Sequence, residues 1–228
     1  MLRNTEMFFG SPLVSGVFLT IPCFGFMYYL IYKQLNTCNP LTGETTMSPY
    51  TLPFNQFNLT QPIDQRIMNV CHDLLTVSLS KYSRVFVMRL DVHMPQEIAQ
   101  EMIRTFNQRF IEKEKNSGYD PLYIMVREVS SQGNIHYHMA LFFDGNQTRN
   151  TYPHFQNAER VLQNIIGSEY SASGLIDQCN HGHRNGIMIE RNAINQFDLD
   201  EVLRQLSYLA KIDQKENVQG KRYFYSRY

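Results

Sequence analysis

Hydrophobic residues follow two different periods along the chain from residue 63 onward. Long segments have apolar residues at helical spacing, and shorter runs between them alternate apolar and polar side chains as strands do. The predicted helices span residues 65–82, 95–115, 155–166 and 198–214. The predicted strands span residues 84–92, 122–129, 135–143 and 185–190. Pro95 is expected to open the second helix, and Asp198 is expected to cap the last one.

The order of these elements predicts the fold class. A strand, a helix, two strands, a helix and a strand, followed by a further helix, match the split βαβ arrangement. We therefore expect an α+β fold in which an antiparallel sheet of the RRM or ferredoxin-like type has its helices on one face. The other face would be free for a ligand. This domain is expected to span residues 81–228, after an apolar segment at 1–46 and a linker with a leading helix at 47–80.

The apolar segment contains a stretch without any charged side chain, residues 7–32. Its length is sufficient to cross a bilayer as a helix of roughly 20 residues. Three interpretations stay open: a membrane anchor, a peripheral hydrophobic tail, and a translation start at Met47 instead of Met1. The first would associate the protein with the inner membrane, and the others would leave it in the cytoplasm.

Composition narrows the function classes only slightly. Lys and Arg number 21, as do Asp and Glu, so a nucleic-acid site would have to be a local feature. The four cysteines form no CxxC pair, which argues against a disulfide framework and against a cysteine zinc site. A reducing cytoplasm is the expected environment.

A candidate metal site lies in the predicted hairpin. His136 and His138 are two residues apart in a strand and therefore point to the same face. If a short turn containing Gly133 pairs Glu128 with His136, all three side chains converge on one patch. Two imidazoles and one carboxylate with open coordination positions suit Mg²⁺ or Mn²⁺. A pair of surface histidines without a ligand is the alternative.

Four further polar residues have similar spacing. His181 and His183 lie in a loop rich in glycine, where a solvated or DNA-facing role is favoured over metal binding. Asp91 and His93 close the first predicted strand. Two alternatives stay open for them: they contact the metal or DNA, or they are ordinary polar residues at a strand end.

The last predicted helix places a tyrosine away from its apolar stripe. On a helical wheel Tyr208 falls about 180° from that stripe, among charged neighbours. Those neighbours are Glu201, Arg204, Lys211 and Lys215. Lys211 has the i,i+3 spacing that brings two side chains together. An ammonium group beside the phenol, with a metal-bound phosphate, would make attack by Tyr208 feasible, whereas the alternative is an ordinary surface Tyr-Lys pair.

These motifs occur in the chain order of a known superfamily. A carboxylate, a His-hydrophobic-His strand and a later helical Tyr-x-x-Lys resemble the HUH endonucleases, which include the rolling-circle replication initiators. More narrowly, the chain is similar to the YagK/YfjJ-type proteins of inovirus and prophage origin, which are regarded as replication initiators. The similar stretches are "RLDVH" at 89–93, "IHYHMALFFDG" at 135–145 and "LSYLAK" at 206–211. The resemblance covers roughly residues 81–215.

The resemblance implies a metal-dependent tyrosine DNA endonuclease and strand transferase that nicks and rejoins single-stranded DNA at a replication origin. Glu128, His136 and His138 would hold Mg²⁺ or Mn²⁺. Tyr208 would form a 5′-phosphotyrosine link, and Lys211 would stabilise the phosphate charge. Since no GxxxxGK[ST] motif is present, a host helicase would unwind the duplex and a host polymerase would extend the 3′ end.

Weaker DNA contacts are expected at basic residues near the end of the chain. They are Arg204, Lys215, Lys221, Arg222 and Arg227. The last three alternate with aromatic residues, a composition that suits base stacking and phosphate pairing, although a packed final strand is the alternative.

Two other functions stay open. One is a catalytically silent DNA-binding regulator on the same fold, and the other is a membrane-tethered phage protein that acts through residues 7–32.

Overall fold

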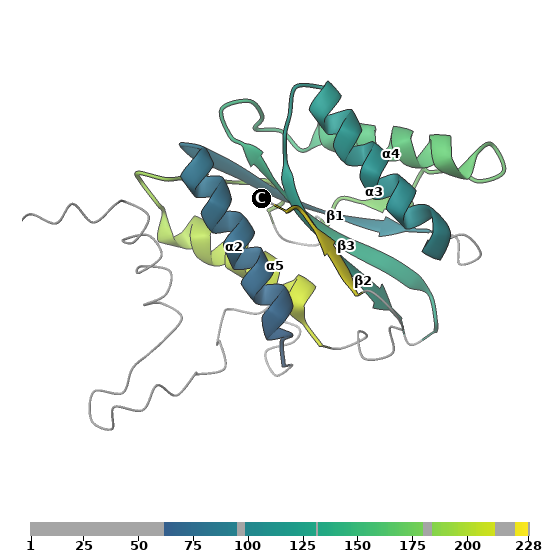
Figure 1. The fold of residues 1–228 in the computed structure, drawn as a ribbon, viewed down its shortest axis with the longest axis horizontal. Helices are drawn as coiled ribbons and strands as arrows, with labels where there is room; N and C mark the ends of the chain where they lie inside the picture. Colours follow the sequence, from purple (N-terminus) through teal and green to yellow (C-terminus); the bar gives the residue numbers. More distant parts are fainter. Residues whose placement is uncertain (1–61, 95–98, 131, 180–183, 213–221, 228) are drawn as a thin grey trace, which may run out of the picture.

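The computed structural model describes residues 62–94, 99–130, 132–179, 184–212 and 222–227 (Figure 1). The helices are α2 (Gln65–Lys81), α3 (Ala99–Asn116), α4 (Tyr152–Ile166) and α5 (Gln196–Ala210). The strands are β1 (Arg84–His93), β2 (Leu122–Val129), β3 (Ile135–Asp144), β4 (Ile176–Asp177), β5 (Ile187–Glu190) and β6 (Tyr223–Tyr225). The expectations for residues 1–46 and for Met47 lie outside the described residues.

The strands form one antiparallel sheet with the order β4-β1-β3-β2-β6, and β5 also pairs with β1. Strands β4 and β5, which follow α4, therefore return to lie beside β1, as the split βαβ arrangement requires. The predicted α+β class and antiparallel sheet are confirmed.

Helices cover both faces of this sheet (Figure 1). The crossover helices α3 and α4 pack on one face, against a core that includes Phe86 and Met88. The helices α2 and α5 pack on the other face, against a core that includes Val85 and Val87. The expectation of a second face free for a ligand is therefore wrong. Strand β1 is buried over most of its length because both of its faces are apolar, a pattern typical of a sheet covered on two sides.

The boundaries of α5 differ from those predicted. The N-cap is Asn195, whose side chain accepts a hydrogen bond from Phe197 N, and Asp198 lies in the first turn. The helix ends at Ala210 instead of continuing to residue 214. It ends there because the backbone of Lys211 pairs with Ile63, which lies two residues before the start of α2.

The two short strands β4 and β6 were not predicted as separate elements. Strand β4 pairs with the end of β1, and β6 pairs with β2 at the edge of the sheet. Strand β6 corresponds to the packed final strand weighed as an alternative for the aromatic tail. Within the described part of the chain, no helix is both long enough and apolar enough to span a membrane.

Candidate metal centre and neighbouring tyrosine

The hairpin of β2 and β3 brings the predicted metal ligands together. Its register pairs Glu128 directly with His136, as expected. The turn between the strands contains Gly133 at a φ of 83°, a conformation that glycine adopts without a steric penalty. Since His138 lies two residues beyond His136, its side chain emerges on the same face of the sheet.

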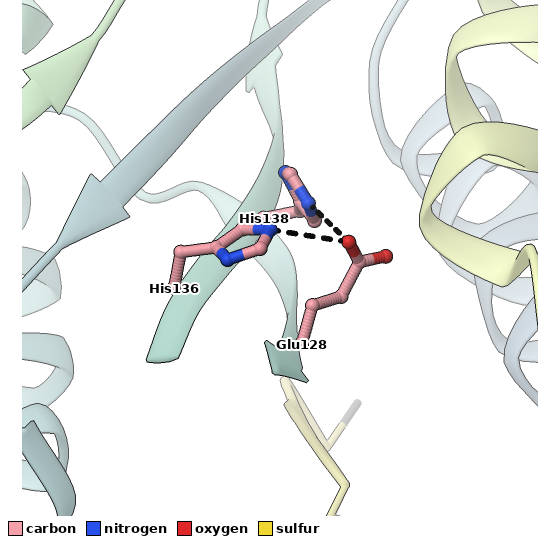
Figure 2. A group of neighbouring side chains, drawn as sticks. All are labelled: Glu128, His136 and His138. Carbon is pink, nitrogen blue, oxygen red and sulfur yellow. Dashed lines mark hydrogen bonds and ion pairs between the residues drawn. The ribbon is translucent and has the colours of Figure 1, made fainter. Parts of the chain in front are cut away.

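The three side chains converge on one carboxylate oxygen (Figure 2). Glu128 Oε2 lies 3.2 Å from His136 Nε2 and 2.9 Å from His138 Nε2. The three ligand atoms are all within 4.8 Å of one another. Glu128 and His138 are buried and His136 is half-buried, so the group opens to solvent on the His136 side. This Glu-His-His group could hold a metal ion, as the sequence predicted.

Strand β1 places a second row of polar groups beside this centre. Asp91 Oδ1 lies 2.7 Å from His138 Nδ1, the ring nitrogen that faces away from Glu128. Arg89 Nη2 lies 3.5 Å from the same Asp91 oxygen. The ring of His93 stacks on His136 with a centroid distance of 5.7 Å.

Helix α5 brings the predicted tyrosine to the same place. The Tyr208 ring meets the His138 ring edge to face, with centroids 5.1 Å apart. Lys211 Nζ lies 4.2 Å from the Tyr208 ring centroid and 3.7 Å from Glu128 Oε2. Arg89 also contacts this ring, with its Cζ 4.6 Å from the centroid. Tyr208 is therefore not a surface residue that faces solvent, because its side of α5 packs against the polar end of the sheet.

The electrostatics of the centre favour a positive charge at the position of His138. Burial alone would lower the pKa of His138, but Asp91 and Glu128 raise this pKa above its ordinary value. Burial alone would raise the pKa of the Asp91 carboxyl, but His138 and Arg89 hold this pKa well below its usual range. Two carboxylates in a buried site thus attract cationic charge, which suits the binding of a divalent cation.

Of the five predicted DNA contacts, the structure describes Arg204, Arg222 and Arg227. Arg204 is buried, with 8% of its surface exposed, and it pairs with the Glu201 carboxylate. A DNA contact at Arg204 stays a prediction. Arg222 is half-buried and Arg227 is exposed. Lys215, Lys221, His181 and His183 lie outside the described residues.

Two residues of the site were missed or undervalued from the sequence. Arg89 was not singled out, and Asp91 was only weighed as a contact. The signal was the alternation in "RLDVH", which places Arg89, Asp91 and His93 on one face of a strand. It becomes informative only once β1 is known to pair with β3, which aligns Asp91 with His138.

The fold and this centre define a class of protein, namely a split βαβ domain with a potential metal site beside a tyrosine and a lysine. The sequence model of the YagK/YfjJ C-terminal domain matches residues 54–226, well over half of the chain. The chain therefore belongs to the YagK/YfjJ C-terminal domain family, as its motifs indicated. The match extends beyond the three similar stretches and includes all elements from α2 to β6. No curated protein and no solved structure gives a significant match.

Proposed function

We propose that this protein is a rolling-circle replication initiator that nicks and rejoins single-stranded DNA through a covalent tyrosine intermediate. The observation that supports this proposal is the position of Tyr208. Its ring packs on His138 of the Glu-His-His group and has Lys211 as its next neighbour. A metal-dependent hydrolase would need the Glu-His-His group but would have no use for a tyrosine and a lysine at this place.

In this mechanism Tyr208 is the nucleophile. Its Oη loses the phenol proton and bonds to the phosphorus, the bond from the phosphorus to the 3′ oxygen breaks, and that oxygen takes up one proton to become a 3′-hydroxyl, so that one proton is lost and one is gained. The 5′ end stays on the tyrosine, so the same steps in reverse rejoin the strand. Lys211 contacts both the Tyr208 ring and Glu128, and its ammonium group is placed to stabilise charge that develops on the phosphate.

Glu128, His136 and His138 would hold the cation, for which we propose Mg²⁺ or Mn²⁺. Three protein ligands leave coordination positions for phosphate oxygens, and the bound ion would polarise the scissile phosphate. The half-buried His136 marks the side from which the DNA would approach, because Glu128 and His138 are closed off by the protein.

The edge strand β6 is the proposed path of the single strand toward this centre. Tyr223 and Tyr225 stack on each other with centroids 5.9 Å apart, and β6 pairs with β2, the strand that contains Glu128. Aromatic faces and cationic side chains such as Arg222 and Arg227 are what binding of single-stranded nucleic acid uses. A host helicase and polymerase would act on the nicked strand.

The test is a covalent protein–DNA band on a denaturing gel. The full chain is incubated with Mn²⁺ and single-stranded DNA fragments that tile the replicon encoding it. We expect a slower-migrating band for the wild type and none for Tyr208→Phe or His136→Ala.

Tyr152→Phe is the matched control, because it removes an exposed phenol hydroxyl on α4, outside the centre and away from β6, and should leave the band intact. If the wild type binds the DNA but forms no band, the proposal fails and a silent DNA-binding regulator explains the fold better. If the band persists in Tyr208→Phe, a different residue is the nucleophile.

A further inference from the structure

We propose that Arg89 and Asp91 form a positioning pair that orients both the metal ligand His138 and the nucleophile Tyr208. This inference rests on the proposed function, and it assigns a role to two residues of β1. Neither residue would touch the metal ion. Both act through the side chains that they hold.

The first half of the pair is Asp91, which fixes the orientation of His138. Its Oδ1 lies 2.7 Å from His138 Nδ1, while His138 Nε2 faces Glu128. Both ring nitrogens face a carboxylate, but a metal ion held beside Glu128 would take the lone pair of Nε2, and the ring proton would then be on Nδ1, where the Asp91 carboxylate stabilises it. Asp91 therefore selects the tautomer in which Nε2 is the ligand atom.

The second half is Arg89, which connects Asp91 to Tyr208. The guanidinium is buried, with 9% of the residue exposed, and its Nη2 lies 3.5 Å from Asp91 Oδ1. Its Cζ lies 4.6 Å from the Tyr208 ring centroid, within the range of a cation–π contact. One ion pair thus bridges the metal ligand on β3 and the tyrosine on α5.

The backbone beneath this pair is held at an interruption of the sheet. Strand β5 pairs with β1 up to Val87, and β4 pairs with it from Asp91. Between these two strands the Asn185 side chain makes the hydrogen bonds to the β1 backbone that a neighbouring strand would otherwise make. Its Oδ1 accepts from Arg89 N at 2.9 Å, and its Nδ2 donates to Arg89 O at 2.7 Å. The position of Arg89 is therefore set independently of its own side-chain contacts.

A spectroscopic test needs no variant. Long-range ¹H–¹⁵N correlation of the imidazoles in the full chain, loaded with the diamagnetic probe Zn²⁺, reports which nitrogen of His138 has the proton. We expect the proton on Nδ1. A proton on Nε2 would overturn the inference, because His138 would then bind the ion through the nitrogen that faces Asp91.

The variant test compares two aspartates that lie opposite each other. Asp91 and Asp177 are paired in the register of β1 and β4, so each change to asparagine removes one negative charge at nearly the same place. Mn²⁺ affinity is measured by the loss of the free-ion signal in electron paramagnetic resonance. Asp91→Asn should weaken binding by about 10- to 100-fold, and Asp177→Asn by far less. Unchanged affinity in Asp91→Asn, or an equal loss in both, would contradict the inference.

The Arg89 contact is tested by the rate of DNA cleavage. Arg89→Lys keeps the charge but loses the planar group that reaches both Asp91 and the tyrosine ring. We expect kcat to fall by about 10²-fold with the KM for DNA little changed, because the tyrosine is misplaced and not the DNA. An unchanged kcat would remove Arg89 from the pair.

These outcomes separate the two proposals. Wild-type protein that binds Mn²⁺ through a His138 with its proton on Nδ1, yet never forms a DNA adduct, would refute the nickase and keep the Asp91 inference. Normal adduct formation and metal affinity in Asp91→Asn would refute the inference and keep the nickase.

Discussion

The candidate metal centre depends on the buried carboxylate of Glu128. With 0% of its side chain exposed, it faces His136, His138 and Lys211. A cation that binds only the folded protein stabilises it by mass action. The stability of the protein should therefore report metal binding directly, without any DNA.

We predict that Mn²⁺ at about 100 times its Kd raises the free energy of unfolding by about 2.7 kcal/mol. The increase should disappear in His136→Ala, which removes one ligand. It should persist in His93→Ala, since His93 stacks on His136 but is not part of the Glu-His-His group. Thermal or urea unfolding with Mn²⁺ and with EDTA measures the difference. Equal unfolding curves under the two conditions would argue against a metal centre.

His72 should determine part of the pH dependence of the protein's stability. Burial lowers the pKa of His72 to about 4, below the value of about 6.5 for an unfolded chain. Protons therefore bind the unfolded state more readily than the folded state. The stability that neutral His72 contributes is fully present above about pH 6.5 and is lost as the pH falls toward 4. The loss should approach about 1.4 kcal/mol per pH unit.

His72→Gln removes this titration. Urea unfolding of the variant should therefore show a shallower loss of stability between pH 6.5 and pH 4.5 than the wild type. Comparison of the two proteins at each pH cancels the contributions of the other titrating groups. Parallel curves would contradict a lowered pKa of His72 in the folded state.

The residues of the centre differ in how far they could be predicted. Glu128, His136 and His138 followed from the two-residue period of strands and one hairpin register, both of which are local properties. Arg89 and Asp91 are at least 37 residues away from Glu128 along the chain. Their role depends on the pairing of β1 with β3, which sequence spacing alone does not reveal.

At the scale of elements, two glycines with the same backbone conformation should respond differently to substitution. Gly133 and Gly186 have φ values of 83° and 84°. A Cβ at Gly133 would meet no atom within 4 Å, whereas a Cβ at Gly186 would lie 2.6 Å from Phe86 Cζ and 2.8 Å from Thr151 Cγ2.

Gly133→Ala should therefore cost only the backbone penalty, about 1–2 kcal/mol in the free energy of unfolding. Gly186→Ala should cost distinctly more, because the ring of Phe86 is packed in the core and has to move. Urea unfolding of both variants gives the comparison. A smaller loss for Gly186→Ala would contradict the packing around β5.

The C-terminal end of α5 could not be predicted from local sequence patterns. The apolar period of the sequence continues through Ile212, so it predicted a helix to residue 214. The chain instead leaves the helix at Lys211, where the backbone pairs with Ile63 and Ile212 N donates to Pro62 O. These partners lie about 150 residues earlier in the sequence, so only the tertiary structure could reveal this end.

At the scale of the molecule, the two helical layers have different roles. The layer of α2 and α5 lies on the face of the sheet that contains the centre. The layer of α3 and α4 is held by a buried network outside the centre. Glu114 Oε2 lies 2.7 Å from His154 Nδ1, Thr148 Oγ1 lies 2.9 Å from His154 Nε2, and Asn157 Nδ2 donates to Glu114 Oε1.

Glu114→Ala should therefore destabilise the fold without changing the centre. The change leaves buried polar groups of His154 and Asn157 without their partner, at a cost of about 3 kcal/mol. The Mn²⁺ affinity of the folded variant should equal that of the wild type. Weaker Mn²⁺ binding would mean that the two layers are coupled through the sheet.

The α+β class and the antiparallel sheet could be predicted because the order of elements allows few topologies. The second helical layer was not predicted. An amphipathic pattern shows that α2 and α5 bury one side, but it does not say which face of the sheet they cover. The burial of both faces of β1 was visible as a nearly continuous apolar run, and that run was the available signal.

The most direct test of the account is the identity of the residue that becomes attached to DNA. After reaction with single-stranded DNA, nuclease treatment and trypsin digestion, mass spectrometry compares the peptides QLSYLAK, residues 205–211, and YFYSR, residues 223–227. We predict that QLSYLAK gains the mass of a 5′-phosphorylated nucleotide remnant on Tyr208 and that YFYSR stays unmodified. A remnant on YFYSR, or on neither peptide although the DNA has been cut, would contradict it.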